Sequence, residues 1–292
     1  MPASRYAAAG GADYSHRLHA GNVGDVWKHC VLIAVLRAVA AEARHVAYVE
    51  THAGDGRYRL HPTGEWTEGV GRLWAEPARG GVVADYLELC RRLGAGDGRP
   101  TTYPGSPAFA RAALGDDAEL GLWEQDQRTA EHLTAAADAH PRTHVTVGDG
   151  IAALDGALHA TRADATVALI DPSWGRKSDW QSVPDALVRA SHRTPRACFL
   201  LWYPVKSLTR PNAMMERLVA AGVEGVAAEL VTTPLAHQRQ RLNGSGVLLV
   251  GAPAAAVDAL GAAAAEIGGR CATFPGTWSF RLRSFAGKHG IC

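Results

Sequence analysis

The fold is decided by one stretch of the sequence, Ala168-Leu169-Ile170-Asp171-Pro172-Ser173-Trp174. Its apolar residues predict the end of a buried β-strand, which delivers an acid, a proline and an aromatic ring at its carboxyl end. In an open α/β sheet this end of the strands is where ligands bind. Asp171 and the Pro172 carbonyl can accept hydrogen bonds from an exocyclic amine, and the Trp174 ring can stack on a base, an interaction of about 1–3 kcal/mol. The alternative is an ordinary strand-terminating turn, because Asp-Pro and Ser are common turn residues.

Predicted strands and helices alternate along the chain from residue 25 to about residue 265. This alternation predicts an α/β fold with a mainly parallel sheet that is covered by helices. Apolar runs predict seven strands, at residues 45–50, 119–123, 143–147, 165–170, 197–203, 226–231 and 246–250. The first helix is expected at about residues 26–43, with Asp25 as its cap. Further helices are expected at about residues 128–139, 151–160, 180–191 and 211–221.

The alternation breaks between Tyr58 and about Leu114. Residues 65–74 and 85–93 look helical, and the whole segment is too long for a plain strand-to-helix connection of about 2–6 residues. We expect a small helical insert at about residues 58–114, beside the ligand-binding edge, where it is either a substrate arm or a packing elaboration. Residues 1–13 are expected to be a loose tail, and residues 14–292 to form the single domain that carries the insert.

The composition is that of an ordinary globular protein. Of the 292 residues, 47% are hydrophobic and 20% are charged, and the formal net charge is +1. This balance excludes a protein that coats nucleic acid with a strongly basic surface, but it allows an enzyme that binds a few phosphates through a local patch. No apolar run reaches about 18 residues, so no membrane span is expected. The N-terminus also lacks the order of a signal peptide.

The cysteines and histidines argue against disulfides and against metal. Five cysteines are scattered along the chain without a CxxC pair, which is typical of reduced thiols in a cytoplasm. Three histidines lie close together in the sequence: His16, His19 and His29. Their neighbouring candidates as ligands, Asp13, Asp25 and Cys30, form no familiar metal-binding pattern. We therefore expect a cytoplasmic protein without a bound metal.

A glycine loop, Thr51-His52-Ala53-Gly54-Asp55-Gly56, follows the first predicted strand. Glycine lets the backbone approach a ligand closely because no Cβ intrudes. The loop lacks the GxGxxG spacing of a dinucleotide site, since Arg57 and Tyr58 follow it directly.

Carboxylates end the next three strands in order. Glu124 can accept hydrogen bonds from both hydroxyls of a ribose, and Asp149 can accept one from an adenine amine. Each residue alone is more often a cap or a turn residue. An ordered row that starts at the His52 and Gly54 loop and ends at Asp171 suits the cofactor S-adenosylmethionine, with the reaction edge beside its sulfonium.

Further blocks of sequence carry a resemblance to a known family. They are Tyr14-Ser15-His16-Arg17-Leu18-His19-Ala20-Gly21-Asn22, then Asp25 and Lys28-His29, the loop from Thr51 to Tyr58, Gly64-Glu65-Trp66-Thr67-Glu68-Gly69, Tyr103-Pro104-Gly105-Ser106-Pro107 and Leu201-Trp202-Tyr203-Pro204-Val205. Over roughly residues 14–253 the chain resembles the bacterial 23S ribosomal RNA adenine-N6 methyltransferase J family.

The resemblance implies a Rossmann-like class I methyltransferase fold with a seven-stranded, mainly parallel sheet. It implies an rRNA (adenine-N6)-methyltransferase that uses S-adenosylmethionine to methylate N6 of an adenine in 23S rRNA. The expected partner is 23S rRNA in a protein-free or loosely folded state, with no metal and no membrane, and the protein is expected to be a cytoplasmic monomer. Two alternatives stay open: an amino-methyltransferase acting on another nucleic acid or a small amine, and a catalytically weakened relative that still binds RNA.

The resemblance also implies site residues. With Gly54 of the glycine loop, the expected cofactor contacts are His29, His52, Ser106, Glu124, Asp149, Gly150 and Asp171. Asp171 is also the implied catalytic residue, Lys28 is an active-site lysine, and Tyr14 lies near the substrate adenine. Asp171 and the Pro172 carbonyl would accept the two N–H bonds of the adenine amine, so that its nitrogen keeps a free lone pair. Trp174 would stack on the base, and Tyr14 and Lys28 would close its other side.

Two parts of the sequence depart from the family pattern. The family has proline and tyrosine where this chain has Ser173 and Trp174. Serine lacks the fixed φ of proline, so the loop could relax and alter rate or substrate choice. The C-terminal part also diverges and contains a basic, aromatic stretch, Trp278-Ser279-Phe280-Arg281-Leu282-Arg283. This stretch either contacts RNA phosphates or covers a sheet edge, and we favour the sheet edge.

Overall fold

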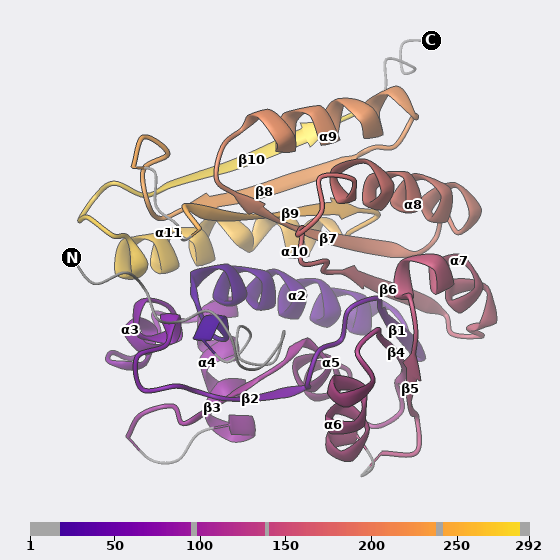
Figure 1. The fold of residues 1–292 in the computed structure, drawn as a ribbon, viewed down its shortest axis with the longest axis horizontal. Coiled ribbons are helices and arrows are strands. Elements are labelled where there is room, and N and C mark those ends of the chain that lie inside the picture. The colour runs from indigo at the N-terminus through magenta and orange to yellow at the C-terminus, as the bar shows by residue number, and fades with distance from the viewer. Residues whose placement is uncertain (1–17, 95–97, 138–139, 238–241, 287–292) are drawn as a thin grey trace.

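Two adjacent buried strands, β1 (Val46–Glu50) and β6 (Ala165–Ile170), form the centre of the sheet. Their residues are buried almost throughout because helices cover both faces, which is why these strands are continuously apolar. The computed structural model describes residues 18–94, 98–137, 140–237 and 242–286 (Figure 1). Tyr14 and the predicted tail at residues 1–13 lie outside these described residues.

The eight strands of the main sheet lie in the order β10-β8-β9-β7-β6-β1-β4-β5. The remaining strands are β4 (Glu119–Glu124), β5 (Thr143–Val147), β7 (Cys198–Val205), β8 (Gly225–Val231), β9 (Gly244–Val250) and β10 (Ser279–Phe285). Strands β5, β4, β1, β6 and β7 pair in parallel, and β9 and β10 run antiparallel to their neighbours. The chain order reverses between β1 and β6, so the carboxyl ends of these strands form the switch point where open α/β sheets bind ligands.

Helices cover both faces of the sheet (Figure 1). One hydrophobic cluster joins the sheet to α2 (Val23–Glu42), α4 (Gly81–Gly94), α5 (Ser106–Leu114) and α11 (Leu260–Cys271), with the short helices η1 (Glu65–Glu68), α3 (Val70–Trp74) and α10 (Ala254–Asp258) beside them. A second cluster joins the other face to α7 (Gly150–Ala160), α8 (Asp179–Arg193) and α9 (Thr209–Ala220). Helix α6 (Gln127–Ala137) packs near β4 and β5. The predicted doubly wound, mainly parallel α/β fold is confirmed.

Helix α2 crosses the middle of the molecule, between the sheet and the helices α4 and α5 (Figure 1). It is buried on nearly all sides, because its residues are apolar around most of its circumference. The prediction that Asp25 caps this helix was wrong. Asn22 is the cap: its side-chain oxygen accepts the Asp25 N–H at 3.0 Å, and the Asp25 carboxylate accepts the Gly21 N–H at 2.9 Å.

The segment at residues 58–114 contains more than the two predicted helices. A small antiparallel ribbon, β2 (Arg57–Arg59) with β3 (Thr102–Pro104), encloses η1, α3 and α4. The predicted helix at residues 65–74 is divided into the 3-10 turn η1 and the short helix α3. Helix α4 packs on α2 and α11. The ribbon joins the segment to the glycine loop, because Gly105 donates its N–H to the Gly56 carbonyl at 2.8 Å.

The prediction of seven strands was one strand short, because β10 extends the sheet. Strand β10 pairs with β8, with Arg281 opposite Glu229. The Glu229 carboxylate is fully buried and accepts hydrogen bonds from Arg281 at 2.6 Å, from Arg283 and from the Tyr203 hydroxyl at 2.9 Å. The basic C-terminal stretch therefore covers a sheet edge, as favoured from the sequence, and its two arginines neutralise a buried acid.

Candidate active site at the carboxyl ends of the strands

Lys28 and Asp171 form an ion pair at the carboxyl end of β6. Lys28 lies in the second turn of α2, and its Nζ is 2.7 Å from Asp171 Oδ2 and 2.9 Å from Asp25 Oδ1. Only 8% of Lys28 is exposed. The structure thus brings together two predicted site residues that are 143 positions apart, and it adds Asp25, which the sequence had not predicted as a site residue.

Burial and charge act against each other in this cluster. Burial opposes the ammonium of Lys28, but the carboxylates of Asp171 and Asp25 outweigh it and raise the Lys28 pKa well above its usual range. Burial likewise opposes the Asp25 carboxylate, but Lys28 outweighs it and lowers the Asp25 pKa to about 2. Lys28 therefore stays charged at any physiological pH and holds one oxygen of Asp171 in a fixed position.

The loop after Asp171 contacts the neighbouring strand β7 and the helix α8 through Trp174. Trp174 has a φ of 55°, a left-handed conformation that costs a residue with a side chain roughly 1–2 kcal/mol. Its indole N–H donates to the Trp202 carbonyl at 3.0 Å, and its ring packs against Trp180 with centroids 4.3 Å apart. Pro172 is buried and Ser173 is exposed. The Trp174 ring is only 8% exposed, so base stacking by this residue stays a prediction.

The other predicted cofactor residues lie along the same edge of the sheet. Strands β6, β1, β4 and β5 are neighbours in this order, so the residues that follow them are neighbours too. Glu124 Oε2 accepts the Gly54 N–H at 3.0 Å, which joins the end of β4 to the glycine loop. Asp149 caps α7, its Oδ1 accepting the Ile151 N–H at 2.9 Å and the Ala152 N–H at 3.1 Å. The predicted row of residues, from the loop with His52 and Gly54 to Glu124, Asp149 and Asp171, therefore lies along the carboxyl ends of neighbouring strands.

The His52 imidazole lies among the carboxylates of this row. Burial lowers the pKa of His52, and the charges of Asp171, Glu124 and Asp149 act in the opposite direction. The net direction is down, so the ring is neutral at neutral pH. Its Nδ1 lies 2.8 Å from the Thr51 hydroxyl.

Two glycines permit a close approach of backbones at this edge. A Cβ on Gly150 would lie 2.2 Å from the Thr51 carbonyl oxygen, so only glycine lets α7 begin so near the loop after β1. Gly54 has a φ of +61°, and a Cβ there would lie 2.0 Å from the Tyr58 hydroxyl. The lack of a side chain at Gly150 thus lets the first turn of α7 lie close to Thr51, and the lack of one at Gly54 leaves room for the Tyr58 hydroxyl.

His29 and Ser106 lie in a buried layer behind the row. His29 Nδ1 is 2.7 Å from the Tyr103 hydroxyl, and its ring packs on Phe109. Ser106 donates to the Glu50 carboxylate, which also accepts from the Tyr48 hydroxyl at 2.8 Å. Burial raises the Glu50 pKa to about 8, against the lowering effect of these two hydrogen bonds. Glu50 and Tyr48 were missed from the sequence, where an acid at the end of an otherwise apolar strand was the available signal.

These residues fit the donor and acceptor groups of S-adenosylmethionine. Each Glu124 oxygen accepts one backbone N–H, and a carboxylate has about four acceptor sites, so both can still accept ribose hydroxyls. Asp149 is exposed and uses only Oδ1 in capping. Buried polar atoms are almost always paired, and His29 Nε2 has no hydrogen-bond partner in the described part of the chain.

Comparison with known proteins identifies the family. Residues 43–282 match the model of the family described as ribosomal RNA large subunit methyltransferase D, RlmJ. The chain belongs to this family. It is 29% identical over 246 residues to ribosomal RNA large subunit methyltransferase J of Escherichia coli, covering 82% of this chain and 87% of that protein. The corresponding protein of Haemophilus influenzae matches with the same identity and the same coverage.

A solved structure supports the fold of this RlmJ-family chain. A crystal structure of a Legionella pneumophila protein superposes with a TM-score of 0.84 and 24% identity, covering 94% of this chain and all of that one. This superposition supports the doubly wound α/β fold, and the family match identifies it as the predicted Rossmann-like fold of a methyltransferase.

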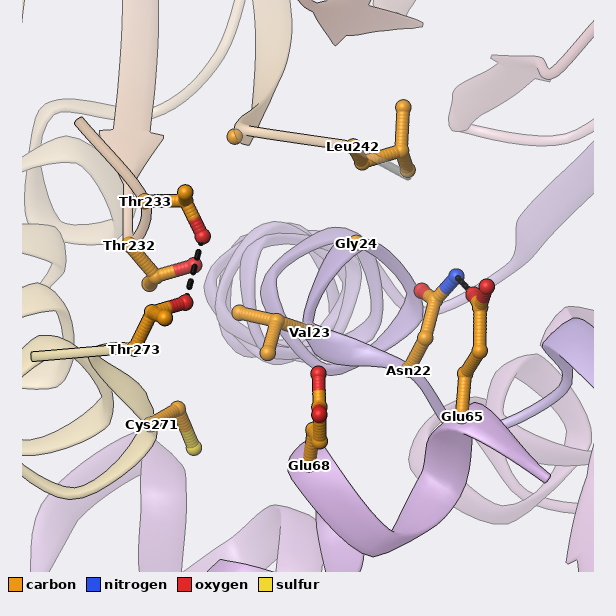
Figure 2. A pocket seen from close by; sticks show the side chains of 11 residues that line it. Asn22, Val23, Gly24, Glu65, Glu68, Thr232, Thr233, Leu242, Cys271 and Thr273 are labelled. Carbon is orange, nitrogen blue, oxygen red and sulfur yellow. Dashed lines mark hydrogen bonds between the residues drawn. The ribbon is translucent and has the colours of Figure 1, made fainter. Parts of the chain in front are cut away.

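A pocket in this RlmJ-family chain lies at the N-terminal end of α2 (Figure 2). It is lined by Asn22, Val23, Gly24, Glu65, Glu68, Thr232, Thr233, Leu242, Gly244, Cys271 and Thr273. None of the predicted site residues lines it. Its polar groups pair with one another, as in the hydrogen bond of 3.0 Å from Asn22 to Glu65 and the contact of 2.6 Å between the hydroxyls of Thr233 and Thr273 (Figure 2).

Trp202 is a further residue beside the Lys28–Asp171 pair, and the sequence analysis had assigned it no role in the site. Its ring centroid is 5.9 Å from Lys28 Nζ, and its indole N–H donates to the Ser245 hydroxyl at 2.7 Å. The Ser245 hydroxyl in turn donates to the Gly24 carbonyl at 3.3 Å, in the first turn of α2. Trp202 thus contacts Lys28 through its ring and the Trp174 loop through its carbonyl. The signal in the sequence was an aromatic residue near the end of the strand beside β6.

Tyr14 lies outside the described residues, so its predicted place near the substrate stays a prediction. Within the described ranges, no group of three or more His, Cys, Asp and Glu side chains could hold a metal ion. His19 pairs with Glu65 at 3.0 Å, whereas His29 is buried against Tyr103. No helix of the described chain is long and apolar enough to span a membrane.

Proposed function

We propose that this RlmJ-family protein transfers a methyl group from S-adenosylmethionine to N6 of an adenine in 23S rRNA. The observation that carries the proposal is Asp171 at the end of β6, held by Lys28 and placed beside a row of cofactor-binding groups on β1, β4 and β5. The names of the E. coli and H. influenzae relatives support a large-subunit ribosomal RNA substrate.

Asp171 and Pro172 are the proposed acceptors for the adenine amine. The N6 lone pair is delocalised into the ring, so the nitrogen is a poor nucleophile. Lys28 occupies Asp171 Oδ2, which leaves Oδ1 to accept one N–H, and the Pro172 carbonyl accepts the other. With both N–H bonds held, the nitrogen becomes pyramidal and its lone pair points toward the methyl donor. Catalysis is then mainly positioning and electrostatics.

The cofactor site is formed by the row at the strand ends. When bound, S-adenosylmethionine supplies an electrophilic methyl group on a sulfonium. Glu124 accepts hydrogen bonds from the ribose hydroxyls of the cofactor, and Asp149 accepts one from the amine of the cofactor's own adenine. The loop with His52 and Gly54 holds the amino-acid end of the cofactor. Gly150 lets α7 approach this loop, and His29 and Ser106 support the site from the buried side.

The substrate adenine must leave its stack to reach Asp171. Unstacking costs least in single-stranded or loosely folded RNA, so protein-free 23S rRNA is the proposed substrate form. Tyr14 and Lys28 are proposed to close one side of the base and Trp174 the other. For Trp174 this requires that its ring turn from Trp180 toward the base. The protein is proposed to act as a monomer in the bacterial cytoplasm, where rRNA is made.

The test is methyl transfer with purified protein. Incubation with methyl-labelled S-adenosylmethionine and protein-free 23S rRNA should yield labelled N6-methyladenine on nucleoside analysis. Asp171→Ala should lower kcat by at least about 100-fold, because it removes the acceptor at the reaction centre. Asp185→Ala is the matched control, since it removes an exposed carboxylate on α8 that pairs with Arg217, and it should keep full activity.

The alternatives predict other outcomes. A label that survives ribonuclease and is lost with deoxyribonuclease would indicate a DNA substrate. Binding of cofactor and RNA without turnover would indicate the weakened relative, which the intact Lys28–Asp171 pair argues against. The absence of label in any RNA would contradict the proposal.

A further inference from the structure

Four exposed basic side chains lie in the segments that follow β6 and β7. Arg176 and Lys177 lie between β6 and α8, Lys206 directly follows β7, and Arg210 lies in the first turn of α9. All four are exposed. Because β6 and β7 are parallel neighbours, both connections leave the same edge of the sheet, beside Asp171. We call these four residues the basic rim.

An aromatic contact holds one residue of the rim, Arg210, close to the loop after Asp171. The Arg210 guanidinium lies 5.7 Å from the centroid of the Trp180 ring. Trp180 in turn packs on Trp174, three residues after Asp171. Arg210 is therefore connected to the loop through two rings in contact, although it is 39 residues away from Asp171 in the chain. A cation held over a ring is positioned in advance for a second, anionic partner.

The charges of the rim are not neutralised within the described residues. None of its four side chains forms an ion pair there, whereas Arg193 of α8 pairs with Asp155 and Arg217 of α9 pairs with Asp185. The nearest acid in sequence is Asp179, whose carboxylate accepts the backbone N–H of Arg176 at 2.9 Å. The rim thus keeps its charge for a partner.

We propose that the basic rim binds the phosphate backbone of single-stranded RNA on either side of the target adenine. This rests on the proposed function, which places the adenine at Asp171. The net charge of the whole chain is +1, so general attraction to RNA is weak and a local patch must supply it. Each phosphate contact on a single strand releases counterions and steepens the salt dependence of binding by about 0.7.

A second set of arginines provides a matched control. Arg44, Arg142, Arg162 and Arg196 are exposed and lie just before β1, β5, β6 and β7, at the opposite edge of the sheet. Changing each of these four residues to glutamine removes the same charge as changing Arg176, Lys177, Lys206 and Arg210 to glutamine. Only the position of the lost charge differs between the two variants.

The experiment measures binding of protein-free 23S rRNA over a range of salt concentrations, with cofactor affinity and methyl transfer measured in parallel. In the rim variant we expect an RNA affinity at least about 10-fold weaker and a salt slope that is smaller by about 2–3, since up to four contacts are lost. Its KM for RNA should rise while kcat and the cofactor Kd stay unchanged. The control variant should behave as the wild type.

The two proposals fail in different ways. Equal RNA affinities and equal salt slopes for the wild type and the rim variant would overturn the rim proposal. An equal loss of affinity in the rim variant and the control variant would also overturn it, because the effect would then be one of total charge. If the wild type binds RNA but methylates none, the proposed function fails whatever the rim variant does. If it methylates RNA and the rim variant does so with an unchanged KM, only the rim proposal fails.

Discussion

Glu50 shows how one residue behind the site carries a measurable consequence. It ends β1, is fully buried, and binds the hydroxyls of Ser106 and Tyr48. Burial raises its pKa from the ordinary 4.5 to about 8, so the folded protein holds this proton at neutral pH whereas the unfolded chain releases it. Ser106 is a proposed cofactor contact, so the protonation of Glu50 affects the site as well as stability.

Glu50→Gln should remove one pH dependence of stability. Between pH 4.5 and about 8 the unfolded chain binds fewer protons at residue 50 than the folded protein, so the wild type loses stability as pH rises through this window. Glutamine is the neutral analogue of a protonated glutamate and does not titrate, so this pH dependence is absent in the variant. Urea unfolding should therefore show that the free energy of unfolding falls less between pH 5 and pH 8 in the variant than in the wild type. Parallel pH dependences of the two free energies of unfolding would contradict this.

The sequence could not predict the directions of the side chains in the site. The order of residues placed Asp171, Pro172 and Trp174 correctly at a strand end, because strand ends are marked by polar residues and proline. Whether the Trp174 ring faces a ligand or the core depends on partners that are distant in sequence, here the Trp202 carbonyl and the Trp180 ring. Lys28 entered only through the family resemblance, since no local pattern on α2 shows that Asp171 faces it.

Strands and helices whose ends are marked by polar residues or glycine were predicted closely. The bounds of β5 and β6 agree with their apolar runs, and α7 begins one residue before its predicted start. The weak signals were missed: β2 and β3 are three residues long and far apart in sequence, and the alanine- and glycine-rich α11 has little polar contrast. Strand β10 did carry a signal, since Phe280 and Leu282 alternate with arginines at the period of a strand.

Helix α7 allows a prediction with its own internal control. Gly150→Ala would place a methyl group 2.2 Å from the Thr51 carbonyl oxygen, so the first turn of α7 must move away from the glycine loop. We expect a loss of stability of about 1–3 kcal/mol and a cofactor affinity at least about 10-fold weaker. Gly156→Ala, in the same helix, has no atom within 4 Å of the new Cβ.

The Gly156→Ala control should stabilise the protein by about 0.5–1 kcal/mol, because alanine favours a helix over glycine, and should leave cofactor binding unchanged. Chemical unfolding and titration calorimetry measure both quantities. Wild-type cofactor affinity in Gly150→Ala would show that the close approach of α7 to the loop does not shape the site.

The reactivity of the cysteine thiols measures how well the core of the whole molecule is closed to solvent. The cysteines in the described ranges, Cys30, Cys90, Cys198 and Cys271, are all free and buried. Burial raises the pKa of Cys198 and of Cys271 to about 12, so little reactive thiolate exists at pH 8.

A thiol reagent at pH 8 should therefore modify at most one of the five cysteines in the folded protein, and all five after unfolding in denaturant. Counting modified thiols by absorbance and by mass tests this. Fast modification of two or more cysteines in the native protein would show that the core opens readily.

The position of α2 has a consequence for the order of folding. Trp27 donates its indole N–H to the Ala228 carbonyl, 201 residues away, and Ser245 donates to the Gly24 carbonyl across 221 residues. Contacts over such separations form slowly, because long loops must close first. The groups proposed to hold the cofactor on β1, β4 and β5 lie within a much shorter span of chain. A refolding molecule is thus expected to gain the part of its cofactor site on β1, β4 and β5 early, and His29 with the lysine–aspartate pair late, so that it holds its methyl donor before it is able to use it.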